Sequence, residues 1–315
     1  MKMILGLAKP TRGTITVFDK QVNRRNRLAI LYEIFKKRYW RCSHRGTKEN
    51  IRGYIFGINR NGGEALMKGI RLEFYKLRRR KIWVIILALL GVQCLWGMWA
   101  FRNMDAKKLS QGYMQCLYHF SVLNTIMMPM IAAITASKIC DLEHKGQTFK
   151  LLMTVMPAGA LFDAKFICAS LHMVAVGAAQ MIFIIVLGKA AGFTEPFPPG
   201  FLLYYFVITI LVTVVILAIQ QVFSLMFSNQ MIPFVIGITG SFAGLFSLFL
   251  PRSMQRGILW SYYGVLTPVR MNWDSQTKIA DLQYIPVDWS SFWLLMGSFA
   301  VIYFTGRRCF TRKER

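Results

Sequence analysis

The sequence predicts an all-α integral membrane protein with six transmembrane helices. Six apolar stretches contain no Asp, Glu, Lys or Arg, 55% of the residues are hydrophobic, and the net charge of +25 lies outside these stretches. Each stretch reaches or approaches the ~20 residues that a helix needs to cross the hydrocarbon core. Strands of a membrane barrel would instead alternate polar and apolar residues. The predicted spans are 82–101, 113–137, 166–187, 201–227, 231–250 and 289–304.

Basic residues predict the orientation of these spans. A basic collar at 71–81 precedes the first span, and a second basic cluster at 307–315 follows the last. Because Lys and Arg near span ends favour the cytoplasm, both termini are expected to be cytoplasmic in a multi-pass protein of the cell membrane. The 251–288 connection is then external. Its aromatic residues from Trp260 to Trp273 are expected to form an interfacial belt, with contact to a transported molecule as the alternative.

The spans contain little that could perform chemistry. Their ionisable side chains, apart from Cys and Tyr, are His119 and His172, which are expected to pack and hydrogen-bond within the bundle. The sequence has no His-Glu-x-x-His pair, no Gly-x-Ser-x-Gly elbow and no Cys-x-x-Cys spacing. It therefore predicts no catalytic residue, metal site or cofactor. The amides in the spans are expected to join helices by hydrogen bonds; they include Gln93, Asn124, Gln180, Gln220 and Gln221.

The loop between the second and third spans predicts a short amphipathic helix at the cytoplasmic surface. Gly146 and Thr148 offer a break followed by a helix N-cap, and Pro157 ends the helix. Apolar residues recur at helical spacing between them. They are Phe149, Leu151, Leu152 and Val155.

This loop resembles the Glu…Gly-Thr…Leu-Leu…Pro…Lys pattern of type-2 ABC exporter permeases. In that family the loop forms the coupling helix, which docks into a groove of the cytoplasmic ATPase. Glu73 and Lys76, before the first span, resemble the family's N-terminal amphipathic helix. The resemblance covers about 67–315 and is closest to the lantibiotic-immunity group. The residues that it places in the coupling helix and its surroundings are Glu143, Lys145, Gly146, Thr148, Lys150, Leu151, Leu152, Pro157 and Lys165.

The resemblance implies a permease subunit that is not itself an enzyme. ATP hydrolysis is expected on a separate ABC ATPase subunit. A second permease subunit, identical or paralogous, is expected to complete the transport path in the bilayer. The expected cargo is an amphipathic, lantibiotic-type peptide or another hydrophobic molecule. An ion-coupled secondary carrier and a non-transport membrane scaffold are the alternative functions. The cations are interpreted as anchors at the membrane surface, so no nucleic-acid partner is expected.

Residues 1–66 differ from the six-helix permease domain predicted for 67–315. They hold fifteen Lys and Arg against four Asp and Glu, a net charge of +11. Residues 1–22 resemble the part of an ABC ATP-binding subunit that follows the phosphate-binding loop, with a predicted strand at 14–18. No Gly-x-x-x-x-Gly-Lys-[Ser/Thr] sequence occurs anywhere in the chain, so the phosphate cradle is absent. We interpret this segment as a poorly ordered remnant of an ATPase gene, with Met67 as the natural start. The alternative is a basic domain that binds anionic lipid or nucleic acid.

Overall fold

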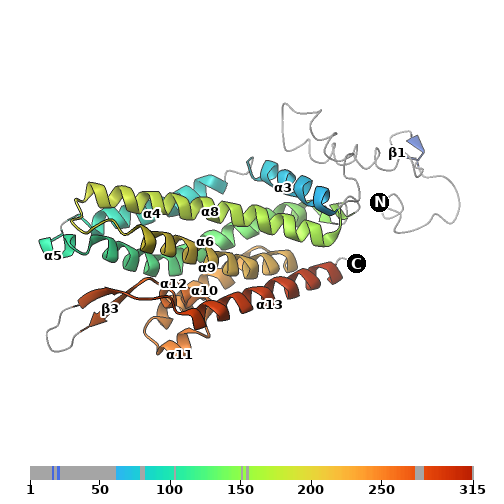
Figure 1. Ribbon diagram of the computed structural model, residues 1–315. Helices are drawn as coiled ribbons and strands as arrows, with labels where there is room; N and C mark the ends of the chain where they lie inside the picture. The colour runs from blue at the N-terminus through green and yellow to red at the C-terminus, as the bar shows by residue number, and fades with distance from the viewer. Residues whose placement is uncertain are drawn as a thin grey trace.

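Long helices lie side by side in an elongated bundle (Figure 1). The computed structural model describes residues 16–17, 20–21, 62–78, 82–102, 104–149, 152–153, 156–273 and 280–313. Within these residues, four helices are long and apolar enough to cross a membrane. They are α4 (Ile82–Ala100), α6 (Gly112–Gly146), α8 (Ala158–Ala190) and α9 (Pro199–Met226).

Two further helices cover the fifth and sixth predicted spans. The helix α10 (Met231–Ser247) is apolar but has only 17 residues. The helix α13 (Trp289–Lys313) begins with an apolar part and ends in a basic turn containing Arg312 and Lys313. The helical fold of a multi-pass membrane protein is therefore confirmed, whereas the number of six spans stays a prediction.

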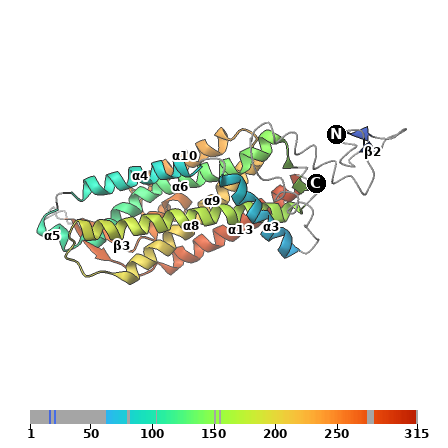
Figure 2. The ribbon, with the colours of Figure 1, turned by 90° about the horizontal axis from the view of Figure 1, so that it is seen from above.

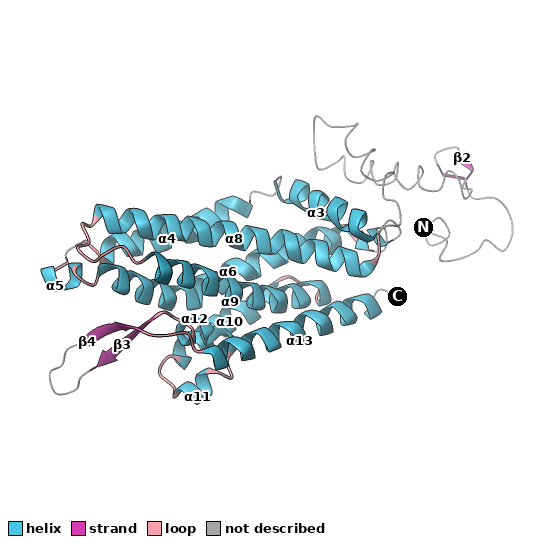
Figure 3. Cartoon of the chain, in the orientation of Figure 1, coloured by secondary structure: helices cyan, strands magenta, loops and turns pink. Residues whose placement is uncertain are grey.

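The shorter elements lie at the two ends of the bundle. The amphipathic helix α3 (Gly62–Arg78) crosses α8 obliquely near the end where α13 finishes (Figure 2). The opposite end carries α5 (Ala106–Leu109) and an antiparallel hairpin (Figure 3). The hairpin is formed by β3 (Val269–Trp273) and β4 (Ala280–Tyr284), with Val269 paired to Tyr284 and Trp273 to Ala280.

This hairpin is an addition to the predicted helices, and the described residues remain mostly helical, as expected for an all-α membrane protein. Before it come α11 (Arg252–Gln255), the 3-10 helix η1 (Leu259–Ser261) and α12 (Tyr262–Val265). A second pair of short strands, β1 (Thr16–Val17) and β2 (Lys20–Gln21), overlaps the strand predicted at 14–18. The rest of residues 1–61 lies outside the described residues.

The helix α6 is the centre of the bundle. It contacts α4, α8, α9 and α10. In its most apolar stretch of 18 residues, 67% is buried, against 28% in the corresponding stretch of α4. Small residues allow this close packing: a Cβ at Gly237 of α10 would lie 2.8 Å from the Cβ of Ala133 of α6. The side of α4 that faces away from the bundle instead exposes large apolar side chains such as Leu95 and Trp99. These side chains suit contact with lipid.

Four buried polar side chains join four helices inside the bundle. The Gln93 amide of α4 donates to Asn124 Oδ1 of α6 at 3.2 Å. Gln180 of α8 donates to Asn124 Oδ1 at 2.7 Å and to Gln93 Oε1 at 3.1 Å. Asn124 donates to the hydroxyl of Tyr205 of α9 at 2.8 Å. The prediction that amides connect the spans is therefore confirmed for these three amides, and Tyr205 completes the network. It is also confirmed for Gln221 of α9, whose amide donates to the Phe162 carbonyl of α8 at 3.0 Å.

The two histidines of the predicted spans also make polar contacts within the bundle. His172 Nδ1 lies 2.7 Å from the carbonyl of Cys168, and its ring stacks on that of Phe74 and contacts the tilted ring of Trp83. His119 Nδ1 lies 2.8 Å from a backbone carbonyl one turn earlier. Both histidines thus have the packing role predicted for them.

Two aromatic residues of the 251–288 connection lie inside the bundle and not in the predicted belt. Tyr262 and Tyr263 are buried, and the Tyr263 hydroxyl lies 2.9 Å from Thr213 Oγ1 of α9. Trp260 packs on α10, where a Cβ added at Gly240 would collide with its ring. Neither an exposed belt nor contact with a transported molecule fits the buried side chains of Tyr262 and Tyr263, so both interpretations were wrong for these two residues. Trp260 is only half-buried, so for this residue they stay predictions.

Candidate functional site: a charged junction of three helices

The helix α6 ends at the loop predicted to receive force from an ATPase. Gln147 has φ 49° and ψ 39°, a left-handed conformation. Its amide donates to the His144 carbonyl at 3.3 Å, and the Thr148 amide donates to the Glu143 carbonyl at 3.0 Å. These two bonds form a Schellman motif, in which glycine is the usual left-handed residue. The predicted break is therefore present, but Gln147 makes the turn and Gly146 is the last residue of α6.

Helical hydrogen bonds continue after this turn. The Leu152 amide donates to the Thr148 carbonyl, and the Met156 amide donates to the Leu152 carbonyl, both at 2.9 Å. Lys150, Leu151 and Val155 lie outside the described residues. Within the residues that are described, the buried Thr148 hydroxyl has no hydrogen-bond partner, so the predicted side-chain cap is not seen.

The apolar face of this segment packs into the bundle. Phe149, Leu152 and Met156 are buried in one cluster with Leu225 of α9 and Phe310 of α13. The rings of Phe149 and Phe310 lie 5.9 Å apart. Pro157 then precedes the first residue of α8. The segment therefore packs against the ends of several long helices.

Four charged side chains meet beside this segment, and we name them the charge cluster: Glu73 and Lys76 of α3, Glu143 of α6 and Lys165 of α8. Lys76 Nζ lies 2.9 Å from Glu73 Oε1 and 2.8 Å from Glu143 Oε1. Lys165 Nζ lies 3.2 Å from Glu73 Oε1 and 3.0 Å from Glu143 Oε2. Each lysine thus contacts both carboxylates, and three helices are joined.

The charge cluster is buried and neutral in sum. The side chains of Glu143 and Lys165 are 0% exposed, and that of Lys76 is 12% exposed. Lys165 also donates to the Ile139 carbonyl at 3.2 Å. Burial by itself would lower the pKa of Lys76, but the carboxylates of Glu73 and Glu143 outweigh it and raise that pKa. Since buried charges are costly unless paired, each member depends on the other three.

The helix α3 approaches the same junction closely. A Cβ at Gly69 would lie 2.7 Å from Met156 Cε and 3.0 Å from the Cβ of Ala164. On the same side of α3, Leu77 is buried in the main core. The short amphipathic helix is thus held against both the loop segment and α8.

A second ion pair ties α13 to α8 at this end. Arg307 Nε lies 2.9 Å from Asp163 Oδ1, and Arg307 Nη2 lies 3.0 Å from Asp163 Oδ2. The Tyr303 hydroxyl donates to Asp163 Oδ1 at 2.8 Å. Lys313 Nζ donates to the Met226 carbonyl at the end of α9, at 2.7 Å. These contacts join residues far apart in the chain, so they could not be predicted from the sequence.

The structure separates the predicted site residues into two groups. Glu73, Lys76, Glu143 and Lys165 come together in the charge cluster. Lys145 does not join them, because its side chain is 76% exposed and pairs with Asp141 at 3.0 Å. No group of three or more His, Cys, Asp or Glu side chains lies together as a metal site among the described residues.

The part of the chain that contains this junction matches a known family. A family model described as ABC-2 family transporter protein matches residues 69–244, from α3 into α10. The chain belongs to this family. It is therefore a membrane permease subunit of an ABC transporter, and not the ATPase. Members of the family generally work with a cytoplasmic ABC ATPase and are often dimeric. No curated protein matches the chain.

Proposed function

We propose that this ABC-2 permease is the six-span subunit of an ATP-driven exporter, driven through residues 147–157. The observation that carries the proposal is the charge cluster, which joins α3, α6 and α8 directly beside this segment. A separate ATPase would bind the segment, and closure of the ATPase would displace it. Because the buried pairs resist separation, α3, α6 and α8 would move together.

Topology and assembly follow from the same proposal. The basic end of α13 lies at the end of the bundle that holds the charge cluster, with both termini in the cytoplasm. The β3–β4 hairpin then faces the outside. A second permease subunit, identical or paralogous, would complete the path. Residues 1–66 would be the remnant of an ATPase gene and take no part in transport.

For the cargo, we propose an amphipathic cationic peptide of the lantibiotic type, removed from the membrane. The support is the likeness of the span layout and of the Glu73–Lys76 segment to the lantibiotic-immunity permeases. A transported peptide that partitions into lipid would reach the permease from the bilayer, which the exposed apolar side of α4 faces.

A cross-linking experiment tests the docking of the ATPase. Lys145, 76% exposed beside the segment, is replaced by Cys in a Cys309→Ser background, since Cys309 is exposed at the same end. We expect this cysteine to cross-link to the co-expressed ATPase. A matched cysteine at the exposed Arg252, near the hairpin end, should not cross-link.

A transport assay separates the proposal from its alternatives. Purified permease and ATPase are placed in vesicles with a labelled cationic peptide, with ATP as the only energy source. Movement that requires both the ATPase and ATP supports the exporter. Movement driven by an ion gradient without the ATPase would instead show a secondary carrier, and no movement under either condition would favour a scaffold.

A further inference from the structure

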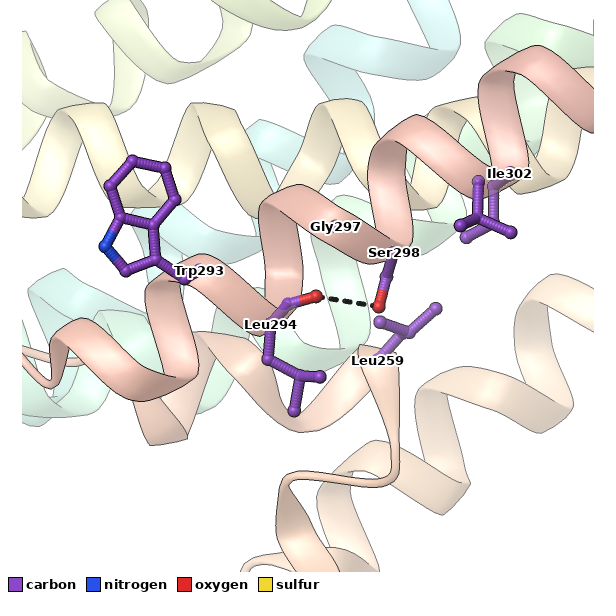
Figure 4. A pocket seen from close by; sticks show the side chains of 7 residues that line it. Leu259, Trp293, Leu294, Gly297, Ser298 and Ile302 are labelled. Atoms are coloured by element: carbon purple, nitrogen blue, oxygen red, sulfur yellow. Dashed lines mark hydrogen bonds between the residues drawn. The ribbon is translucent and has the colours of Figure 1, made fainter.

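An apolar groove runs along the exposed face of α13, near the N-terminal end of that helix (Figure 4). Its volume is about 480 Å³, and it is lined by Leu259 of η1 and by residues of α13 from Trp293 to Ile302. Gly297 forms part of its floor, and no atom lies within 4 Å of the position that a Cβ would take there. The distance from Trp293 to Val301 is roughly 12 Å at 1.5 Å per residue, close to the ~15 Å hydrocarbon depth of one leaflet.

The groove is almost entirely apolar, and the indole N–H of Trp293 is its one side-chain donor without an acceptor among the described lining residues. The one side-chain hydroxyl in its lining, that of Ser298, already donates to the Leu294 carbonyl at 2.8 Å. The exposed side chains around it are apolar: Trp293 is 67% exposed and Val301 67%. A chain of methylene groups fits such a lining, whereas a polar segment would lose its hydrogen bonds.

Positive charge collects at the hairpin end of this groove. Arg256, three residues before Leu259, pairs with Asp288 at 2.8 Å directly before α13 begins. Arg252 lies one helical turn before Arg256, since the Arg256 amide donates to the Arg252 carbonyl at 3.2 Å. Partial desolvation and the charges of Arg270 and Arg256 lower the pKa of the Arg252 guanidinium, against the opposing effect of Asp288. Arg252 and Arg256 thus lie one turn apart at the end of the groove, and Arg256 pairs with the single carboxylate of Asp288.

Both oxygens of the Asp288 carboxylate already accept hydrogen bonds. Asp288 accepts hydrogen bonds from the hydroxyls of Ser290 at 2.7 Å and Ser291 at 2.8 Å, in addition to Arg256. Arg256 Nε is buried and has no hydrogen-bond partner among the described residues. The arginines thus keep positive charge that the described side chains do not neutralise.

From these two features we infer that the groove binds one acyl chain of an anionic phospholipid, whose phosphate lies beside Arg252 and Arg256. Charge complementarity selects an anionic headgroup, and the apolar lining accepts the hydrocarbon. The lipid belongs to the leaflet on the hairpin side of the bundle. This site is separate from the charge cluster, so it does not depend on the proposed coupling or cargo.

Quenching of tryptophan fluorescence by brominated lipid tests this inference. The full chain is reconstituted in phosphatidylcholine bilayers containing a small fraction of brominated phosphatidylglycerol or, separately, brominated phosphatidylcholine. The signal of Trp293 is the difference between the unmodified chain and Trp293→Phe. We expect Trp293 to be quenched several times more by the anionic lipid, and Arg252→Gln to reduce this preference about fivefold.

Two glycine variants provide the matched control. Gly297→Leu fills the groove and should lower the quenching of Trp293 by phosphatidylglycerol to the level seen with phosphatidylcholine. Gly91→Leu, at a position on α4 that also has nothing within 4 Å, should leave it unchanged. Equal quenching by both lipids, or full preference retained in Arg252→Gln, would overturn the inference and indicate ordinary surrounding lipid.

Discussion

Glu143 Oε1 of α6 lies 2.8 Å from Lys76 Nζ of α3, across 67 positions of the chain. The pair brings the N-terminal amphipathic helix into contact with the residue that also closes the turn of α6, since the Glu143 carbonyl accepts the Thr148 amide. One residue therefore belongs to both the charge cluster and the turn that starts the loop segment. A displacement of that turn cannot leave the cluster unchanged.

Replacing one member of the charge cluster should be strongly destabilising. Glu143→Gln leaves two buried lysines facing Glu73 alone, and we expect a loss of about 3–5 kcal/mol in the free energy of unfolding. Lys165→Met should cost a similar amount. Together they should cost less than their sum, by about 0.5–3 kcal/mol. Unfolding in detergent, followed by tryptophan fluorescence, measures all three variants.

Lys145→Gln is the control for this cycle. Its pair with Asp141 is on the surface, so the change should stay below about 1 kcal/mol. Additive effects of Glu143→Gln and Lys165→Met would show that the two side chains do not interact.

Adding one methyl group at two glycines should have opposite effects. Gly69→Ala places a Cβ within 2.7 Å of Met156 Cε and 3.0 Å of the Cβ of Ala164, and overpacking of this kind costs about 1–3 kcal/mol. Gly91→Ala meets no atom within 4 Å in the middle of α4. It should be neutral or stabilise by up to about 1 kcal/mol, because alanine favours helix. Thermal unfolding measures both variants, and equal shifts would contradict the close approach of α3.

The left-handed turn after α6 should favour glycine. Gln147 has φ 49°, a conformation that costs a residue with a side chain about 1 kcal/mol and glycine little. Gln147→Gly should therefore raise the unfolding temperature, whereas Gln147→Ala should not. If both variants behaved alike in thermal unfolding, this backbone conformation would be wrong.

Stability at acid pH should depend on Asp288. Hydrogen bonds from Ser290 and Ser291, together with Arg256, lower the pKa of this carboxyl below its ordinary value. Its contribution is complete above the unfolded pKa of about 3.9 and is lost as the pH falls through the lower folded pKa. In Asp288→Asn the acid branch of the stability curve should become flatter. Unfolding temperatures between about pH 2 and pH 5, a range that includes the unfolded pKa of Asp288, measure the slope. An unchanged slope would exclude this contribution of Asp288.

The sequence predicted much of the fold because composition alone identifies apolar helices in lipid. It also singled out Glu73, Lys76, Glu143 and Lys165 separately, by resemblance to a family pattern. It could not predict that they meet, since this depends on how α3 crosses α8. The pair of Asp163 and Arg307, 144 positions apart, was missed for the same reason.

Two features of the 251–288 connection were also not predicted from the sequence. The β3–β4 hairpin lies in a connection with mixed charges and no strong alternation, so no strand was predicted there. Tyr262 and Tyr263 were expected at a surface because aromatic residues in a loop are typical of interfaces. In the structure their hydroxyls find buried partners, the Arg256 carbonyl and Thr213. A buried hydroxyl with its own acceptor is a tertiary property that the sequence does not encode locally.

The amide network of Gln93, Asn124, Gln180 and Tyr205 limits how this permease can change shape. Separating α4 from its neighbours within the bilayer would leave amides without partners in hydrocarbon, at a cost of several kcal/mol for each group. Helices α4, α6, α8 and α9 should therefore travel as one rigid block during a transport cycle. The gap through which a molecule passes would then open at the perimeter of this block, where one subunit meets the next, and not through its middle.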